Sequence, residues 1–217
     1  MALLSDLAAA DRHLTGCDAV MRRLVTSHGP CGLTVDPATP FAALVRAIAH
    51  QQLHGKAATT ILGRLSARSP RQRLPTPAEL LALPVAALRA DGFSGAKAAA
   101  LHDLAAKAHA GVVPTARVLA TLSDAEAIER LTIVRGVGRW TVEMLLMSRL
   151  GRHDVWPTDD FGVRNGYRIA YGLEAMPTAK ALAALGEPFA PWRSAAAWYL
   201  WRAADQEKLA RTKTKAV

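Results

Sequence analysis

Two short segments of the chain carry residues suited to holding phosphate and to stabilising positive charge. In the first, Gly136 and Gly138 flank Val137 and precede Arg139. Glycine lacks Cβ, so the backbone there can turn tightly and lie close to another backbone. A helical pattern begins at Arg139, so unbonded amides and the positive end of the helix dipole would face an anion at this turn. These four residues therefore predict a phosphate-binding turn.

In the second segment two carboxylates, Asp159 and Asp160, follow Pro157 and Thr158. This order is typical of a helix start, with Thr158 as the N-cap and both acids in the first turn. The helix dipole and the first amides would keep a carboxylate there ionised. We hypothesise that one carboxylate faces a reacting centre while the glycine turn holds a nucleic-acid backbone. An aspartate at a helix start is more often only a cap, so the residue types alone leave both roles open.

Composition favours an all-helical protein with an anionic partner. The chain has 217 residues, 51% of them apolar, so a sizeable core can form. Alanine and leucine dominate and β-branched runs are short, which favours an all-α fold. There are 27 Lys and Arg against 18 Asp and Glu, a formal net charge of +9. Nucleic acid is the first candidate partner and an anionic membrane surface the second, while a merely soluble basic protein stays open.

Cysteine content and hydropathy exclude several classes. Cys17 and Cys31 are the only cysteines, too few for an iron–sulfur cluster or a four-cysteine zinc site. They are expected to be free thiols in a reducing compartment. No apolar run approaches the roughly 18 residues of a membrane span, and the first residues do not resemble a signal peptide. We expect a cytoplasmic protein, or a nuclear one in a eukaryote, with no membrane partner.

Helical periodicity and turn residues give the expected elements. A helix through Arg130, started by a Ser123–Glu126 capping box, is followed by the glycine turn and a second helix from Arg139. Together they form a helix-hairpin-helix unit. Pro84 is expected to break a helical stretch into two pieces. The other helices are expected over residues 5–25, 41–48, 56–65, 96–110, 161–171 and 191–208. A polar corner, residues 50–55, joins two of these helices.

The aromatic residues gather in the last third of the chain, where all five tryptophans lie at or after position 140. Trp198 and Trp201 are expected to pack in the core of the last helix rather than to serve a site. Trp140 adjoins the glycine turn, and Trp192 begins a helix. Both are expected to face a cleft between two lobes.

Three sequence blocks, taken together and in order, resemble one family. They are the hairpin Leu131–Thr141 with the Pro-x-Asp-Asp segment after it, the stretch Phe41–Ala58, and Pro191–Ser194. They are similar to the helix-hairpin-helix DNA glycosylases that carry a catalytic aspartate, and most to the 3-methyladenine DNA glycosylase II branch. The resemblance runs from about residue 36 to 202. The longer members have an N-terminal mixed domain, so this chain looks like a compact helical form.

The resemblance implies an all-α fold of two helical lobes with a base-binding cleft between them. One lobe is expected over residues 38–160, with the helix-hairpin-helix at about 128–150. The other combines residues 1–37 and 161–217 and ends in a basic tail. The resemblance implies double-stranded DNA with alkylated bases as the partner. A monomer is expected because no segment of the sequence suggests an oligomer seam.

The resemblance also assigns roles by position. Asp160 matches the catalytic aspartate, with Asp159 as the alternative, and the family's phosphate-binding turn matches Gly136, Val137, Gly138 and Arg139. Gln52, Leu53 and His54 match the wedge pushed into the duplex. Gln52 could instead bond to backbone at a helix end, and His54 could be an ordinary surface or core histidine. The base pocket matches Trp140, Met144 and Trp192, with Met144 where some relatives place a tyrosine. Backbone carbonyls of Thr132, Val134 and Gly136 match ligands of a monovalent cation, sodium or potassium. Further candidate phosphate contacts are Lys56, Lys97, Arg149 and Arg164.

The implied activity is removal of alkylated bases of the 3-methyladenine or 7-methylguanine type from DNA. The base is flipped out, the N-glycosidic bond is hydrolysed and an abasic site remains. Members that also cut the strand use a lysine where this chain has Trp140, so a monofunctional enzyme without a required cofactor is expected. An alternative is a non-catalytic, structure-selective DNA-binding protein. An oxidised-guanine or mismatch glycosylase is disfavoured by the missing lysine and cluster cysteines.

Overall fold

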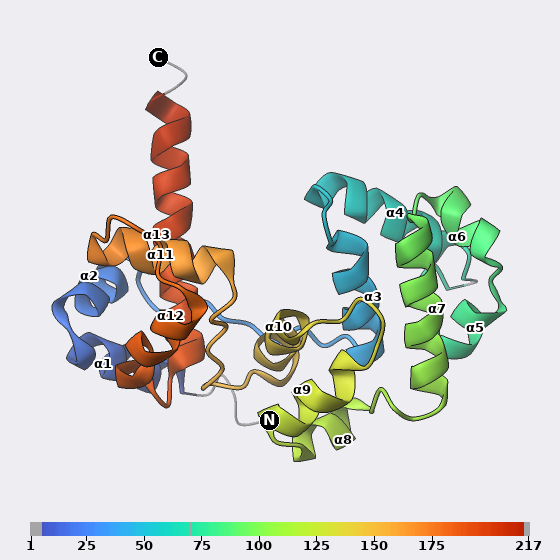
Figure 1. The fold of residues 1–217 in the computed structure, drawn as a ribbon, viewed down its shortest axis with the longest axis horizontal. Helices are drawn as coiled ribbons and strands as arrows, with labels where there is room; N and C mark the ends of the chain where they lie inside the picture. Colours follow the sequence, from blue (N-terminus) through green and yellow to red (C-terminus); the bar gives the residue numbers. More distant parts are fainter. Residues whose placement is uncertain (1–5, 70, 215–217) are drawn as a thin grey trace. The chain divides into compact units, whose positions relative to one another are not determined.

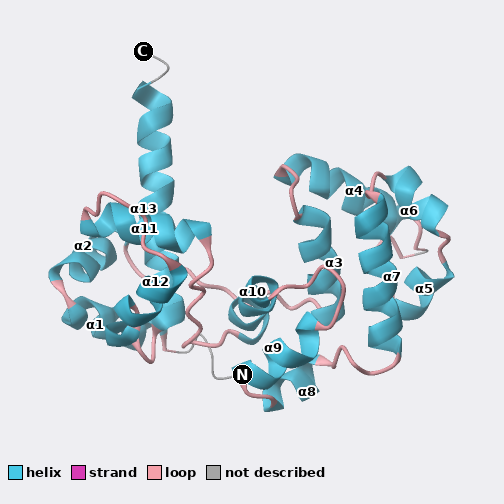
Figure 2. Ribbon diagram, viewed as in Figure 1, coloured by secondary structure: helices cyan, strands magenta, loops and turns pink. Residues whose placement is uncertain are grey.

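The computed structural model describes residues 6–69 and 71–214. Over these residues the chain forms helices and connecting loops with no strand (Figure 2), so the all-α prediction is confirmed. Within the same residues, none of the helices combines the length and apolar character needed to cross a bilayer.

The chain divides into two compact units. The hairpin unit is residues 37–145, and the carboxylate unit combines residues 1–36 with 146–217. The boundary lies at residue 145 and not at the expected residue 160, because residues 146–160 group with the chain ends. The reason is local bonding: Ser194 Oγ donates to the Arg152 carbonyl, the Val155 amide donates to Ser194 Oγ, and Arg193 pairs with Asp154.

In the hairpin unit, α7 is the central helix and packs against α3, α5 and α6 (Figure 1). Leu101, Leu104 and Ala98 on α7 are fully buried there. The helices of this unit are α3 (Pro40–His50), α4 (Gly55–Ala67), α5 (Pro77–Ala82), α6 (Val85–Asp91), α7 (Gly95–His109), α8 (Ala116–Thr121) and α9 (Asp124–Thr132). Helix α10 (Arg139–Leu150) begins in this unit and ends in the other.

In the carboxylate unit, α11 lies on α13, and Gly166 allows it to do so. A Cβ on Gly166 would collide with the Leu200 carbonyl. The N-terminal helices are tied to this pair by Tyr171 Oη donating to Asp18 and Tyr199 Oη donating to Asp11. The elements are α1 (Leu7–Cys17), α2 (Ala19–His28), α11 (Phe161–Tyr171), α12 (Ala179–Leu185), the 3-10 helix Glu187–Phe189 and α13 (Arg193–Thr214).

Hydroxyl caps start many of these helices, as the sequence indicates. In the predicted capping box, Ser123 Oγ accepts from the Glu126 amide and the Glu126 carboxylate accepts from the Ser123 amide. The break at Pro84 is also present. Further caps of the hydroxyl-to-amide type are Thr39, Thr76, Ser94, Thr115 and Thr178.

Two element predictions are wrong, each because an aspartate caps a helix. The single helix expected over residues 5–25 is broken at Asp18, whose carboxylate accepts from the Met21 amide and starts α2. Thr158 is not an N-cap. Asp160 itself caps α11, so neither acid lies inside the first turn. The last helix extends to Thr214 and includes most of the basic tail, whose remaining residues lie outside the described chain.

Candidate active site

Asp160 is a buried carboxylate held by two neutral donors. Its side chain caps α11, with Oδ1 accepting from the Val163 amide at 2.7 Å and from the Trp201 indole Nε1 at 2.8 Å. The residue is 8% exposed, whereas Asp159 beside it is exposed. Neutral donors orient a carboxylate without cancelling its charge. Of the two candidate acids, only Asp160 has a fixed direction.

Trp201 reaches this carboxylate because Gly162 leaves room for it. A Cβ on Gly162 would lie 2.8 Å from Trp201 Cδ1 and 3.1 Å from Trp201 Nε1. The expectation that Trp201 only packs in the core is therefore wrong, since its N–H is a partner of Asp160. No spacing in the sequence links positions 160 and 201, because the packing of α11 on α13 brings them together. The one local signal is a glycine in the first turn of a helix, where it costs stability.

Phe161, which the sequence reasoning did not single out, directly follows the carboxylate. It begins α11 and its side chain is 69% exposed. A large aromatic side chain this exposed beside a buried aspartate is a candidate surface for a flat ligand. The signal that could have found it is adjacency to the acidic pair.

The hairpin, residues 133–138, is a tight turn anchored by two valines. Val134 and Val137 are buried, and the Val137 amide donates to the Val134 carbonyl at 3.0 Å. Gly136, Gly138 and Arg139 are exposed. Gly136 has φ +77°, a conformation that disfavours other residues. Within the expected phosphate-binding set, Val137 thus anchors the turn while its three neighbours present the exposed backbone.

The three carbonyls expected to bind a cation follow one another around this turn. The Gly136 carbonyl accepts from Gln51 Nε2 at 2.7 Å, and the Val134 carbonyl accepts from Val137. A carbonyl oxygen has two lone pairs, so neither bond removes the oxygen as a ligand. Among the described residues there is no cluster of histidine, cysteine or acidic side chains that could hold a metal, and both cysteines are free thiols.

The corner carries the three wedge candidates on its exposed side. Between the end of α3 at His50 and the start of α4 at Gly55, Gln52 adopts φ +54° and Leu53 is 39% exposed. His54 is exposed and stands at the N-cap of α4 without a side-chain capping bond. The bond from Gln51 to Gly136 brings the corner and the hairpin together within the hairpin unit.

The residues expected to form the base pocket fall in both units. Trp140 and Met144 lie on α10 within the hairpin unit, and Trp140 is 44% exposed. Trp192 belongs to the carboxylate unit, where it meets the His153 ring edge to face with centroids 4.9 Å apart. Trp140 therefore belongs to one unit and Trp192 to the other.

The candidate phosphate contacts separate into exposed and engaged side chains. Lys56 is exposed, and Arg139 is 64% exposed although it pairs with buried Glu143. Arg149 is nearly buried and pairs with Asp36, and Arg164 donates to the Pro177 carbonyl. Lys97 donates to two backbone carbonyls inside the hairpin unit. Lys56 and Arg139 are therefore the best placed to meet a phosphate.

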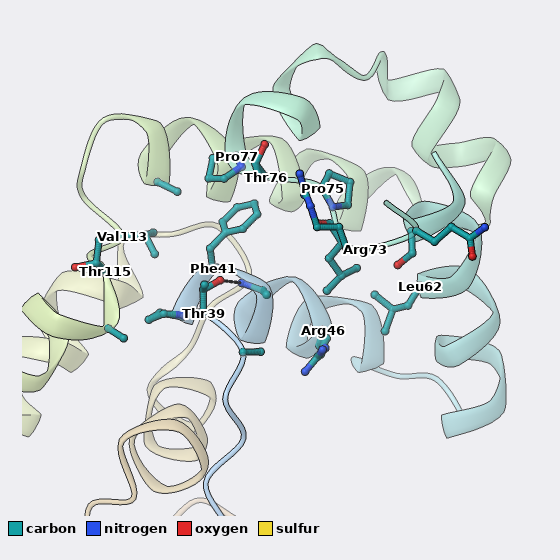
Figure 3. Close-up of a pocket in the computed structure, with 18 of the residues that line it drawn as sticks. Thr39, Phe41, Arg46, Leu62, Arg73, Pro75, Thr76, Pro77, Val113 and Thr115 are labelled. Atoms are coloured by element: carbon teal, nitrogen blue, oxygen red, sulfur yellow. Dashed lines mark hydrogen bonds between the residues drawn. The ribbon is translucent and has the colours of Figure 1, made fainter. Parts of the chain in front are cut away.

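A separate cavity of about 920 Å³ opens in the hairpin unit between α3, α4 and the loop before α5 (Figure 3). Phe41, Leu62, Pro75 and Pro77 line it, with Arg46 and Arg73 at its sides. None of the predicted site residues is among the described residues that line it. The described residues that line it include no carboxylate, histidine or cysteine.

Comparison with known proteins identifies the family. The HhH-GPD superfamily of base excision DNA repair proteins matches residues 45–191. DNA-3-methyladenine glycosylase 1 of Schizosaccharomyces pombe is 41% identical over 216 residues, covering 97% of this chain and 95% of that protein. The alkylbase DNA glycosidase-like protein mag2 of the same yeast is 34% identical, with 91% and 94% covered.

Solved structures agree. The S. pombe 3-methyladenine DNA glycosylase Mag1, in complex with abasic DNA, has a TM-score of 0.83 at 42% identity, covering 89% of this chain and 95% of that one. A DNA-3-methyladenine glycosidase from Bacillus halodurans has a TM-score of 0.81 at 31% identity, with 90% and 88% covered. The chain belongs to the HhH-GPD superfamily of base excision DNA repair proteins.

Proposed function

We propose that this protein is a DNA glycosylase that removes alkylated bases of the 3-methyladenine or 7-methylguanine type from double-stranded DNA. It hydrolyses the N-glycosidic bond and leaves an abasic site for base excision repair. The relatives that match nearly the whole chain are named for 3-methyladenine or alkylbase excision. The observation that carries the proposal is Asp160, a buried carboxylate oriented by neutral donors.

Asp160 acts on the charge that develops in the sugar. Breaking the glycosidic bond builds an oxocarbenium-like state, and a fixed negative charge nearby stabilises it. Val163 and Trp201 both bind Oδ1, which sets the direction of the carboxylate group. An ionised carboxylate in this position can also orient the attacking water.

The aromatic residues serve the base. N-alkylated purines such as 3-methyladenine and 7-methylguanine are cationic in DNA, and cations bind the faces of aromatic rings. Trp140, Met144 and Trp192 are proposed to line the base pocket, and Phe161 adds an exposed ring beside Asp160. Contacts with aromatic faces recognise a flat, positively charged base and do not require one particular hydrogen-bonding pattern. The proposed pocket therefore suits several alkylated bases.

Reaction ends at base release. A glycosylase that also cuts the strand forms a Schiff base through a lysine. The corresponding position here is Trp140, which has no nucleophilic nitrogen. We therefore propose a monofunctional hydrolase.

The hairpin and the corner hold the DNA. Exposed backbone at Gly136, Gly138 and Arg139 is proposed to bind a phosphate. Gln52, Leu53 and His54 are proposed to fill the gap left by the flipped nucleotide and so to offset the unstacking cost. The protein is proposed to work as a monomer, in the compartment that holds the DNA: the cytoplasm, or the nucleus of a eukaryote.

A monovalent cation is proposed at the hairpin. The carbonyls of Thr132, Val134 and Gly136 form a neutral, all-oxygen set, which suits sodium or potassium. When bound, such an ion supplies positive charge beside the phosphate-binding turn. The residues themselves fix the turn through the Val134 and Gly136 hydrogen bonds already described.

The experiment that tests the function measures base release from methylated DNA by wild type, Asp160→Asn and Asp159→Asn. We expect wild type and Asp159→Asn to release 3-methyladenine or 7-methylguanine, with strand breaks only after mild alkali. Asp160→Asn should lose roughly 10²- to 10³-fold in rate and still bind abasic DNA.

Two results would overturn parts of this reading. Normal excision by Asp160→Asn with loss in Asp159→Asn would move the catalytic role to Asp159. No release of any alkylated base by wild type, together with tight binding to abasic DNA, would favour a non-catalytic DNA-binding protein.

A further inference from the structure

One face of α7 carries three residues that hold both DNA-facing segments of the hairpin unit. Lys97, Ala100 and Asp103 are spaced three apart along the helix, so they lie in one row along its surface. Lys97 contacts the corner, and Ala100 and Asp103 contact the hairpin. Ala100 and Asp103 belong to none of the expected site sets, whereas Lys97 was expected only as a candidate phosphate contact.

Lys97 closes the C-terminal end of α3. Its Nζ donates to the Ala49 carbonyl at 2.7 Å and to the Gln51 carbonyl at 2.6 Å. The last carbonyls of a helix lack partners within the helix and form the negative end of its dipole, so an ammonium group satisfies both needs. Burial lowers the pKa of Lys97. Two of its three donors bind backbone carbonyls, which leaves this lysine poorly suited to a DNA phosphate.

The corner needs this support because its backbone is unusual. Gln52 has φ +54°, in the left-handed region that residues other than glycine seldom occupy. Such a conformation persists only where neighbouring groups fix it. Immediately before it, the Gln51 carbonyl is bound by Lys97, and the Gln51 side chain donates to the Gly136 carbonyl at 2.7 Å. Both bonds hold the residue that leads into the wedge.

Ala100 and Asp103 fix the other segment. Asp103 Oδ2 accepts from the Arg135 amide at 2.7 Å, and Lys107 binds both carboxylate oxygens at 2.6 Å. Burial raises the pKa of Asp103, but the bonds from Lys107 and Arg135 outweigh it and leave the pKa lowered. A Cβ on Gly136 would lie 3.4 Å from Ala100 Cβ, so the turn is packed onto the same face of α7.

We propose that Lys97 is a positioning residue that sets the wedge in register with the phosphate-binding hairpin, with Gln51 as the direct link and Asp103 as the anchor on the hairpin side. The proposal rests on the proposed function, because wedge and hairpin act on the same duplex. Flipping one nucleotide requires the wedge to enter at a fixed distance from the held phosphate. Loss of Lys97 therefore weakens flipping and excision without removing a phosphate contact.

The test compares Lys97→Met with wild type in three assays. These are single-turnover excision of an alkylated base, fluorescence of 2-aminopurine placed next to the lesion, and the salt dependence of binding to abasic DNA. We expect excision to fall on the order of tenfold to a hundredfold, the flipping signal to drop, and the slope of log affinity against log salt to stay at its wild-type value. A lost phosphate contact would instead lower that slope by about one.

Three further variants sharpen the result. Lys97→Arg restores a cationic donor and should recover much of the excision rate. Gln51→Ala leaves the net charge unchanged and breaks the link from the corner side, so it should reproduce the loss even if Lys97→Met fails to fold. Lys180→Met, an exposed lysine of α12, removes the same charge and should behave as wild type.

Wild-type excision by both Lys97→Met and Gln51→Ala, or a salt slope reduced by about one in Lys97→Met, would overturn the proposal. If wild type itself releases no base, the proposed function fails, but the flipping signal and the salt slope still decide the role of Lys97.

Discussion

In the carboxylate unit, the group proposed to act on DNA is a charged side chain, and two neutral donors bind it. Asp160 is bound by an indole N–H and a backbone amide. In the hairpin unit, the groups proposed to act are backbone amides and carbonyls, and the side chains that hold them are largely charged. Lys97 binds carbonyls at the corner, and Asp103 binds an amide of the hairpin.

This difference follows from what each unit must preserve. A carboxylate that stabilises a developing cation acts through its negative charge, and a cationic partner would offset part of the field that it exerts on that cation. A backbone segment has no charge to lose, and charged side chains form stronger hydrogen bonds to it than neutral ones. Neutral donors thus orient the carboxylate without offsetting its charge, and charged side chains fix the backbone of the corner and the hairpin.

The largest expected effect comes from adding a methyl group at a tightly packed glycine of the carboxylate unit. Gly166→Ala places a methyl group against the Leu200 carbonyl, and a backbone atom cannot move aside as a side chain can. We expect a loss of about 3 kcal/mol in the free energy of unfolding. Urea unfolding followed by tryptophan fluorescence reports it, because Trp156, Trp192, Trp198 and Trp201 all belong to the carboxylate unit.

The matched change in the hairpin unit is Gly63→Ala. Gly63 lies in α4, and a Cβ there meets no atom within 4 Å. Alanine should stabilise the helix by about 0.5–1 kcal/mol. Equal destabilisation by both substitutions would contradict the packing described for α11 on α13.

The next effect concerns the neutral donor to Asp160. Trp201→Phe keeps a large ring and removes the N–H, so the carboxylate loses one of its two described donors. A hydrogen bond to a charged group contributes roughly 1.5–3 kcal/mol, and we expect base excision to slow by about tenfold or more. Affinity for abasic DNA should not change, because the hairpin unit is untouched.

Trp198→Phe is the control, since Trp198 lies one turn earlier on α13 and packs on Tyr199 rather than on Asp160. It should excise at nearly the wild-type rate. Gly162→Ala places a methyl group against Trp201 and so disturbs the bond from its indole N–H to Asp160. It should slow excision as Trp201→Phe does. A Trp201→Phe protein as active as Trp198→Phe would show that the indole donor to Asp160 is dispensable for excision.

The smallest effect is a pH dependence in the hairpin unit. Bonds from Arg73 and then from Thr76 lower the pKa of Glu79 to about 2, against an ordinary value of 4.5. The folded value is depressed, so the stabilisation is fully present above about pH 4.5 and disappears as the pH falls through about 2. Both side chains of the Arg73–Glu79 pair are 40% exposed, which keeps the effect small.

Thermal melts of wild type and Glu79→Gln check this. The melting temperature of the variant should be lower by a constant amount between pH 7 and pH 5, and the gap should shrink below pH 4.5. A gap that grows on acidification would mean that the carboxylate is not stabilised in the folded protein.

The helices and their caps were largely predictable because they depend on neighbours in the sequence. Ser123 and Glu126 are three residues apart, and Pro84 acts on its own turn, so both features appear as expected. Asp18 shows the limit of this reasoning. It lies within a continuous apolar pattern, and the bond from Tyr171 that accompanies its capping role comes from a distant helix.

The same limit applies to the candidate site. Gly136 and Asp160 could be found because they lie in short motifs. Trp201, Lys97 and Asp103 could not, because their partners are 32 to 48 positions away. Their contacts arise from helix packing. The sequence around a helical lysine or tryptophan does not show whether its side chain faces solvent or supports a site.

The division of the chain has a consequence for synthesis. The hairpin unit is one continuous segment, whereas residues 1–36 of the carboxylate unit find partners such as Tyr171 and Tyr199 only after that segment is complete. Because chains emerge from the ribosome N-terminus first, the unit proposed to hold DNA is synthesised before residues 146–217. Trp201, the indole donor of Asp160, emerges near the end. A translation product halted before residue 201 would carry a complete hairpin unit but would lack the indole donor of Asp160, and we expect such a form to bind DNA without excising bases.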